Sequence, residues 1–192
     1  MFARTERLLL RPGWVDDAPA LTDAIAHESV AHKLARLPWP YSVDDARWFL
    51  GQDRAEGDAN FLIFARTQGV PKLIGGIGLH PDDEGETEIG YWIAPPYWGL
   101  GFATEAGRAV VSIARHTLRL PKLVSGHFVD NPASGNVLRK IGFKPTGRVA
   151  NRMSLARGKE TPCVLYALDL SDADDEDMPP AVQTGNVVRL AA

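Results

Sequence analysis

The segment that most constrains the fold is a short glycine loop between an extended stretch and a helix, residues 97–106, YWGLGFATEA. Residues 87–95, TEIGYWIAP, are rich in β-branched and aromatic residues and end at a proline, which is typical of a strand. From 101 to 115, apolar residues recur at helical spacing. This direct succession of strand, loop and helix indicates a fold built from layers of strands and helices.

Strands and helices mix along the rest of the chain. Extended apolar runs predict further strands at 4–12, 60–67, 71–81, 121–129, 145–153 and 161–170. Further helices are predicted to begin at capping residues: Asp16, Ser42 and Asn131. Antiparallel pairs come first and a strand–helix–strand–helix unit follows, so the sequence predicts a mixed α/β (α+β) fold.

Composition limits the classes of protein. The chain has 192 residues, of which 45% are hydrophobic, and we expect a single domain over 1–170. Residues 171–192 hold five acidic residues and one arginine, which predicts a disordered acidic tail. A net charge of −3 provides no basic field for nucleic acid or for an anionic membrane. Apolar runs are too short for a signal peptide or a membrane span, so we expect a cytoplasmic protein.

Thiol and imidazole groups give little sign of a reactive or metal site. The single cysteine, Cys163, excludes an internal disulfide and lies in an apolar run. We expect a buried thiol there, and a nucleophile is the alternative. The five histidines show no metal-ligand spacing, so no metal is predicted. His80 either assists in catalysis or is a surface-turn histidine.

The glycine loop itself favours a phosphate ligand. Gly99 and Gly101 carry no Cβ, and the amides at the start of the following helix point outward beside the positive end of its dipole. The hydroxyl of Thr104 adds a donor. No P-loop lysine follows, and Thr104 stands where a dinucleotide-binding loop has its third glycine. A glycine turn that merely starts a helix is the alternative, and the loop alone does not decide between them.

A second motif decides. Residues 131–143, NPASGNVLRKIGF, follow the loop after about thirty residues. Together with EIGYWIAPPYWGLGFATEA, residues 88–106, they resemble the GNAT superfamily of N-acetyltransferases, and within it the RimJ/RimL type that acetylates the N-termini of ribosomal proteins. The resemblance extends over 4–170. It implies a central, mostly antiparallel twisted sheet flanked by helices, and acetyl-CoA as the acetyl donor.

The resemblance also implies which residues hold the coenzyme. Backbone amides of the loop would bind its pyrophosphate: Trp98, Gly99, Leu100, Gly101, Phe102, Ala103 and Thr104. Leu100 stands where the RimJ/RimL type often has lysine. Free backbone groups near Trp92 and Ile93 would pair with the pantetheine arm. Asn131 and Ser134 would contact that arm near the thioester, with helix capping as their competing role.

Acetyl transfer needs a base, because most of an α-amine with a pKa near 8 is protonated at pH 7. Glu88 matches the strand glutamate that serves as base in similar enzymes; a solvated glutamate at a strand edge is the alternative. Glu105, in the first helical turn, is expected to stabilise the helix end. Leu138 occupies the position of the superfamily's usual acid, a tyrosine. Ser134 or water would then protonate the leaving thiolate, or no acid is needed because a thiolate leaves readily.

The acceptor is the least constrained feature. The RimJ/RimL resemblance favours a protein or peptide N-terminal α-amine, while small amines (antibiotics, polyamines, amino acids) and a non-catalytic CoA-binding regulator are alternatives. Trp39, Tyr41 and Trp48 are predicted to line the acceptor site, or else to cover the sheet. A nearly neutral body with an acidic tail favours a cationic acceptor. The sequence leaves a homodimer open.

Overall fold

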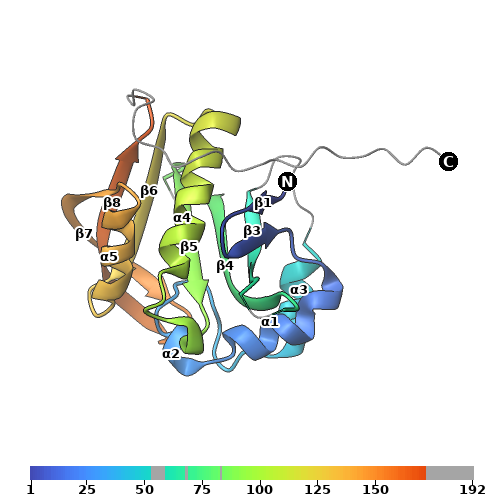
Figure 1. Ribbon diagram of the computed structural model, residues 1–192. Helices are drawn as coiled ribbons and strands as arrows, with labels where there is room; N and C mark the ends of the chain where they lie inside the picture. Colours follow the sequence, from blue (N-terminus) through green and yellow to red (C-terminus); the bar gives the residue numbers. More distant parts are fainter. Residues whose placement is uncertain (53–58, 68, 83, 172–192) are drawn as a thin grey trace.

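The computed structural model describes residues 1–52, 59–67, 69–82 and 84–171. Within them, eight strands form one sheet in the order β1-β2-β3-β4-β5-β6-β8-β7. Neighbouring strands are antiparallel except β5 and β6, which are parallel. Helices α4 and α5 lie in front of this sheet in Figure 1. The predicted mixed fold with a mostly antiparallel sheet is confirmed.

The strands are β1 Ala3–Arg4, β2 Leu8–Arg11, β3 Asn60–Ala65, β4 Lys72–Pro81, β5 Thr87–Ile93, β6 Lys122–Phe128, β7 Lys144–Ser154 and β8 Lys159–Asp169. The helices are α1 Ala18–Ile25, α2 Glu28–Ala31, α3 Val43–Leu50, α4 Phe102–Ser112 and α5 Pro132–Lys140. A π-helical turn, Ile113–Thr117, continues α4, and short 3-10 turns span Val15–Asp17 and Pro95–Tyr97.

Two elements differ from the sequence prediction, and one predicted segment is not tested. The strand expected over 4–12 is two short strands, because the amide of Thr5 bonds the carbonyl of Leu8 at 3.0 Å and closes a turn. Helix α2 was not predicted, since four residues are too few to show helical periodicity. The tail predicted over 171–192 lies, apart from Ser171, outside the described residues.

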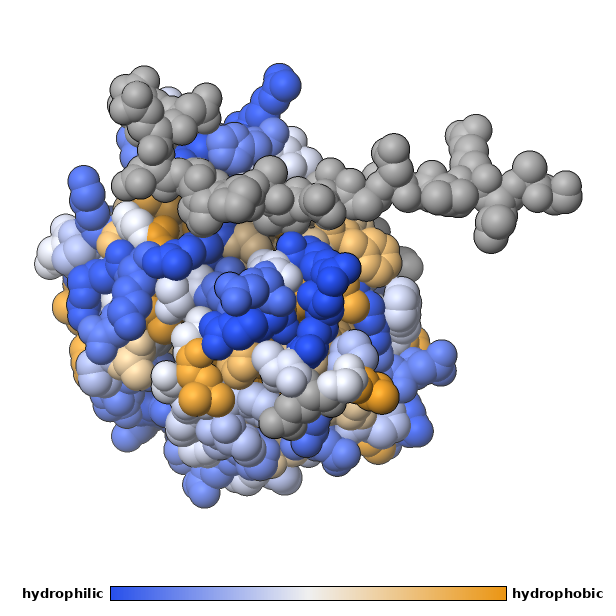
Figure 2. Space-filling model, in the orientation of Figure 1, coloured by the Kyte–Doolittle hydropathy of each residue, from blue (hydrophilic) through white to orange (hydrophobic). Residues whose placement is uncertain are grey.

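Both faces of the central strands β3 and β4 are buried, whereas most residues of the edge strand β7 are exposed. Phe61 and Ile63 of β3 join a core cluster with residues of α4 and α5, whereas Leu62 and Phe64 join a second cluster with residues of α1 and α3. Successive strand residues point to opposite faces, so the run NFLIFA packs against helices on both sides. The outer surface over α4 and α5 is mainly hydrophilic, with hydrophobic residues in small separate groups (Figure 2).

Glycine in β4 allows a large side chain of β5 to lie flat on the sheet. A Cβ at Gly76 would stand 2.5 Å from the indole Nε1 of Trp92. Glycine within a strand is typical of such close approaches, and β3, which pairs with β4, shifts register between Ile63 and Phe64. Trp92 packs against the cluster of α1 and α3. Because strand residues alternate between faces, Glu88 and Gly90 of β5 lie on this same face of the sheet.

Candidate active site

The sheet opens between its two parallel strands. Only Glu88 and Val124 are aligned as a pair between β5 and β6, and next to them Ser125 Oγ donates to the carbonyl of Ile89 at 2.9 Å. Beyond this point the described residues of the two strands form no further ladder pair. The carboxyl-terminal halves of β5 and β6 therefore present edges to which an extended ligand can bind.

The glycine loop lies at the open end. Gly99 has φ 76° and Gly101 has φ 83°, values that favour glycine, and a Cβ at Gly99 would meet no atom within 4 Å. Gly101 has no side chain that could cap α4. The amide of Glu105 bonds the carbonyl of Gly101 at 3.0 Å, so the three amides from Phe102 to Thr104 have no intrahelical acceptor. The loop thus has the geometry of a phosphate cradle.

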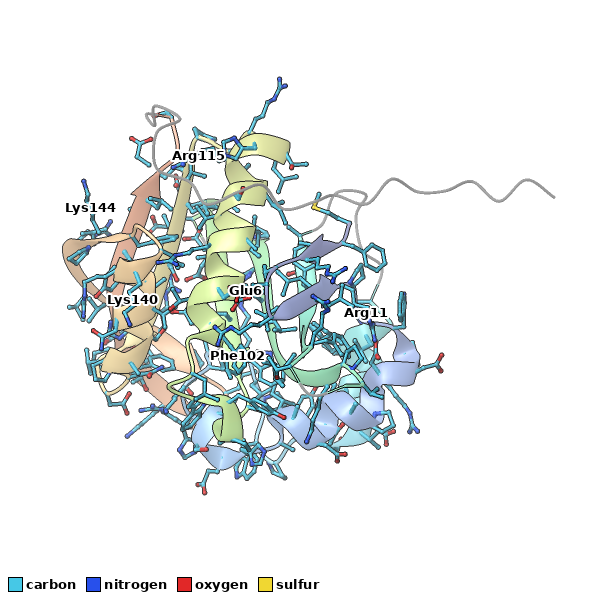
Figure 3. The ribbon with its side chains drawn as sticks, in the orientation of Figure 1. Glu6, Arg11, Phe102, Arg115, Lys140 and Lys144 are labelled. Atoms are coloured by element: carbon cyan, nitrogen blue, oxygen red, sulfur yellow. The ribbon has the colours of Figure 1, made fainter. Side chains whose placement is uncertain are left out.

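Arg7 and Glu105 hold this loop in place. Glu105 accepts hydrogen bonds from the hydroxyl of Thr5 at 2.5 Å, from the Arg7 amide at 2.9 Å and from Arg7 Nε at 2.7 Å. Arg7 Nη1 donates to the carbonyl of Leu100 at 3.0 Å, and its guanidinium lies 4.5 Å from the ring centre of Phe102. Figure 3 labels Phe102, the first residue of α4. Burial raises the pKa of Glu105, but these hydrogen bonds lower it by more, so the pKa lies below its usual value.

Sequence reasoning missed Arg7 and assigned Glu105 only to its own helix end. The two residues are 98 positions apart, and one arginine near the start of a chain is no signal by itself. Their contact explains how a short glycine loop keeps one conformation: a charge-assisted bond ties Leu100 to the β1–β2 turn.

The backbone expected to be free at Ile93 is partly engaged. Trp98 Nε1 donates to the carbonyl of Ile93 at 2.6 Å, so this carbonyl already has one partner. Pairing of the pantetheine arm with backbone groups near Trp92 and Ile93 stays a prediction. The Lys33 Nζ lies 3.8 Å from the ring centre of Trp98. Trp98 therefore fixes the loop against β5 through its side chain.

Glu88 is a buried, ionised carboxylate. Its side chain accepts a hydrogen bond from Arg152 through Oε1, and Oε2 lies 3.5 Å from His80 Nε2. Burial raises the pKa of Glu88, but His80 and Arg152 together hold it below the usual range. With 8% of its surface exposed, Glu88 is not the solvated strand-edge glutamate that the alternative reading required. Its role as a base stays a prediction.

His80 and Arg152 reach Glu88 from two different strands. His80 lies near the end of β4, directly opposite Glu88, and a Cβ at Gly90 would stand 3.0 Å from its ring. The surface-turn alternative for His80 is therefore wrong. Arg152 comes from β7, two strands beyond β6 in the sheet order, and no feature of the sequence singled it out.

Ser134 and Tyr91 link β5 to α5 across the opened sheet. The Tyr91 hydroxyl lies 2.8 Å from Ser134 Oγ and donates to the Ser134 carbonyl at 3.0 Å. Burial raises the pKa of Tyr91 to about 12. Asn131 occupies the cap position of α5 but makes no side-chain capping bond, so capping does not compete for its amide group. Leu138 is fully buried and carries no acid function.

The aromatic residues predicted for the acceptor site lie in different environments. Tyr41 packs against the cluster of α1 and α3, and burial raises its pKa to about 12. Trp39 is 38% exposed, and Trp48, on α3, is 70% exposed. None of the three lines the cavity described next, and their contact with an acceptor stays a prediction.

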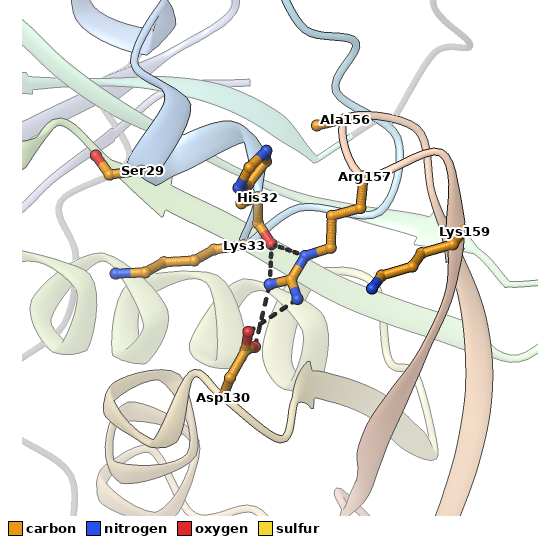
Figure 4. Close-up of a pocket in the computed structure, with 7 residues that line it drawn as sticks. All are labelled: Ser29, His32, Lys33, Asp130, Ala156, Arg157 and Lys159. Atoms are coloured by element: carbon orange, nitrogen blue, oxygen red, sulfur yellow. Dashed lines mark hydrogen bonds and ion pairs between the residues drawn. The ribbon is translucent and has the colours of Figure 1, made fainter.

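A cavity of about 530 Å³ lies beyond the open end of the sheet (Figure 4). It is bounded by α2, by the turn after β6 and by the turn between β7 and β8. The residues that line it are Ser29, His32, Lys33, Asp130, Ala156, Arg157 and Lys159. The β7–β8 turn is fastened to the segment after α2, since the amide of Leu155 bonds the carbonyl of Ala35 at 2.9 Å. Sequence reasoning did not predict this cavity.

Other groups offer less chemistry. Cys163 is buried, as expected, and burial raises the pKa of its thiol. In the described ranges no group of three or more His, Cys, Asp or Glu side chains is placed to hold a metal ion. No helix among these same residues has the length and apolar character needed to cross a membrane.

Comparison with known proteins identifies the class. The family described as acetyltransferase (GNAT) domain matches residues 7–144. The uncharacterized N-acetyltransferase YoaA of Bacillus subtilis is 41% identical over 149 residues, 74% of this chain and 82% of YoaA.

Solved structures share the fold at lower identity. RimL, a ribosomal L7/L12 α-N-protein acetyltransferase in complex with coenzyme A, superimposes with a TM-score of 0.72 at 21% identity, covering 90% of this chain and 100% of RimL. Spermidine N-acetyltransferase of Vibrio cholerae, in complex with CoA and spermine, has a TM-score of 0.72 at 18% identity, covering 87% and 98%.

The opened sheet, the glycine loop and the family match define an acyl-transferring enzyme, and the chain belongs to the acetyltransferase (GNAT) family. It is an N-acetyltransferase with acetyl-CoA as its donor. The residues of the loop fit this donor, because the amides before Glu105 lack acceptors and the space beside Gly99 is open.

Proposed function

We propose that this enzyme acetylates the α-amine of a protein or peptide N-terminus. The observation that carries transfer to an amine is the opening of the sheet after Glu88, with the glycine loop at its open end and a buried carboxylate at its closed end. The choice of an α-amine is supported by the RimJ/RimL resemblance of residues 88–106 and 131–143.

The loop residues Trp98 to Thr104 would hold the pyrophosphate of the donor, chiefly through backbone amides. The edge of β5 near Trp92 and the Asn131 amide would position its pantetheine arm. When bound, acetyl-CoA supplies a thioester that the amine attacks directly in a ternary complex. Holding both reactants in one orientation supplies much of the acceleration.

Glu88 would receive the amine proton through water or through His80. It is ionised at neutral pH and faces the same side of the sheet as Trp92, by strand alternation. Because the pKa of Glu88 is lowered, Glu88 is ionised at any pH above the usual range of carboxyl pKa values. Protonation of Glu88 should therefore not limit the rate at such pH values. The rate should instead rise toward pH 8 as the α-amine loses its proton. Ser134, whose hydroxyl meets that of Tyr91, would protonate the departing thiolate.

A small-molecule amine is the second candidate, and one of the solved relatives is a spermidine N-acetyltransferase. Purified enzyme should be incubated with acetyl-CoA and a panel of N-terminal peptides, amino acids, polyamines and aminoglycosides, with products read by mass spectrometry. Acetylated peptide α-amines support the proposal. Acetylation of polyamines or aminoglycosides alone would replace it with the second candidate.

The role of Glu88 is tested by Glu88→Gln. We expect kcat to fall at least about tenfold while affinity for acetyl-CoA is kept, in the range of general base catalysis. Glu86→Gln is the matched control, because the Glu86 side chain is half-buried and pairs with Lys122 at 2.9 Å, outside the site. Turnover by Glu88→Gln equal to that of the control would remove Glu88 from the base role.

A further inference from the structure

The cavity at the open end of the sheet is positively charged. Its lining includes the cations Lys33, Arg157 and Lys159 and one anion, Asp130, which leaves +2 when His32 is neutral. Glu28 lies 3.8 Å from His32 but is not part of the lining.

The one acidic residue of the lining is already neutralised. Arg157 binds Asp130 through Nη1 at 2.8 Å and Nη2 at 3.1 Å, and its Nε donates to the carbonyl of His32 at 2.8 Å. Figure 4 shows this guanidinium fixed between α2 and the turn after β6. The Arg157 side chain is only 16% exposed, so it forms a rigid wall of the cavity.

Two lysine charges remain for a ligand. Lys159 has no ion-pair or hydrogen-bond partner for its side chain among the described residues. Lys33 lies over the ring of Trp98, a contact that orients its ammonium group without cancelling the charge. Two lysine cations beside a fixed guanidinium, with Asp130 as the one acidic residue of the lining, are a setting that attracts carboxylate or phosphate.

The cavity belongs to the side of the molecule from which the amine must arrive. Val30 of α2 packs in the cluster of α1 and α3, the same face toward which Trp92 and, by alternation, Glu88 point. Helices α4 and α5, on whose side the uncapped loop amides begin, cover the other face. The β7–β8 hairpin that supplies Arg157 to the cavity also supplies Arg152 to Glu88.

We propose that this cavity binds an anionic group of the acceptor, namely side-chain carboxylates of an acidic peptide segment just after its N-terminal residue. This inference rests on the proposed function and narrows its substrate class. It replaces the cationic acceptor expected from overall charge, because the local field at the site is positive whereas the acidity of the chain is concentrated in 171–192. Arg157 and Lys159 lie beyond the residues 7–144 that the family match covers, whereas Lys33 lies within them.

The test compares two peptide amides, Ser-Glu-Glu-Ala-Ala and Ser-Gln-Gln-Ala-Ala, which differ only in carboxylates. We expect the native enzyme to have an acceptor KM about tenfold lower for the Glu peptide, and Lys159→Glu to abolish that difference. The KM for acetyl-CoA should stay within about twofold. Lys144→Glu, the same charge change at the far end of β7 (Figure 3), should keep the preference.

Each other outcome has a defined meaning. Equal KM values for the two peptides in the native enzyme would overturn the inference. A rise in the KM for acetyl-CoA in Lys159→Glu, with the peptide preference kept, would assign the cavity to the coenzyme and overturn it as well. If neither the native enzyme nor any variant acetylates either peptide, the proposed function fails. Calorimetric titration of both peptides into the CoA-bound protein then tests the cavity alone: binding of the Glu peptide that Lys159→Glu weakens supports it, and equal binding overturns it.

Discussion

Replacing Arg152 by methionine should destabilise the protein in a pH-dependent way. The variant keeps most of the side-chain length but leaves Glu88 with only His80 as a partner, at 3.5 Å. Removing one partner of a buried ion pair costs about 3–5 kcal/mol, and a hydrogen bond to a charged group contributes about 1.5–3 kcal/mol. The Arg152 side chain is 28% exposed, so water replaces part of the interaction. We expect a loss of about 2 kcal/mol at pH 7.5.

The sign of the pH dependence follows from the pKa of Glu88. In the native protein the pKa of Glu88 is lower than in the unfolded chain. The ion pair therefore stabilises the fold fully at pH values above the unfolded pKa, and this contribution is lost as the pH falls through the folded pKa. Without Arg152, the raising effect of burial is less opposed and the folded pKa of Glu88 increases. The destabilisation by Arg152→Met should therefore be larger at pH 7.5 than at pH 4.

Urea unfolding at the two pH values, with linear extrapolation to water, measures this difference. Arg148→Met makes the same chemical change at an exposed position of β7, and should shift the free energy of unfolding by less than about 0.5 kcal/mol at either pH. Equal destabilisation by Arg152→Met at pH 4 and pH 7.5 would refute the reasoning, since it would mean that Arg152 contributes through packing alone.

Two further substitutions test the loop and a helix start. Gly101→Val places a β-branched residue at φ 83° with its Cβ 3.5 Å from Arg7 Nη2. This variant should bind acetyl-CoA at least about tenfold more weakly, as measured by calorimetry. The control Gly85→Val, at φ 80° in open space, should leave the affinity for acetyl-CoA unchanged. Ser42→Ala removes the hydroxyl that the Asp45 amide bonds at 3.3 Å and should lower the free energy of unfolding by about 1 kcal/mol in urea titration; no change would show that the cap is not formed in solution.

Local sequence signals predicted most of the elements. Ser42 begins α3 with a reciprocal capping box, because Asp45 stands three residues later and its carboxylate reaches back to the Ser42 amide at 2.8 Å. Gly142 takes φ 100° just after α5, a left-handed conformation that favours glycine at the end of a helix. Such features depend on residues a few positions apart, so the local sequence is enough to predict them.

The candidate site was predicted in part for the same reason. Gly99 and Gly101 are one short motif, and their positive φ angles follow from the loop they form. Glu88 was identified by its place in a strand, but its burial and its partners His80 and Arg152 were not. A pKa depends on what surrounds a group, and for Glu88 the surroundings come from strands that are distant in the sequence.

The sequence by itself determined the order of the longer strands and helices, the glycine loop and the family motifs, because each depends on contiguous residues. Only the tertiary structure decided that Arg7 ties the loop to the β1–β2 turn and that the Ile93 carbonyl accepts a hydrogen bond from the Trp98 indole. It also decided that a basic cavity forms where α2 meets the β7–β8 turn. Contacts between residues about a hundred positions apart, such as that of His32 with Arg157, arise from how the layers pack, and no local pattern specifies them.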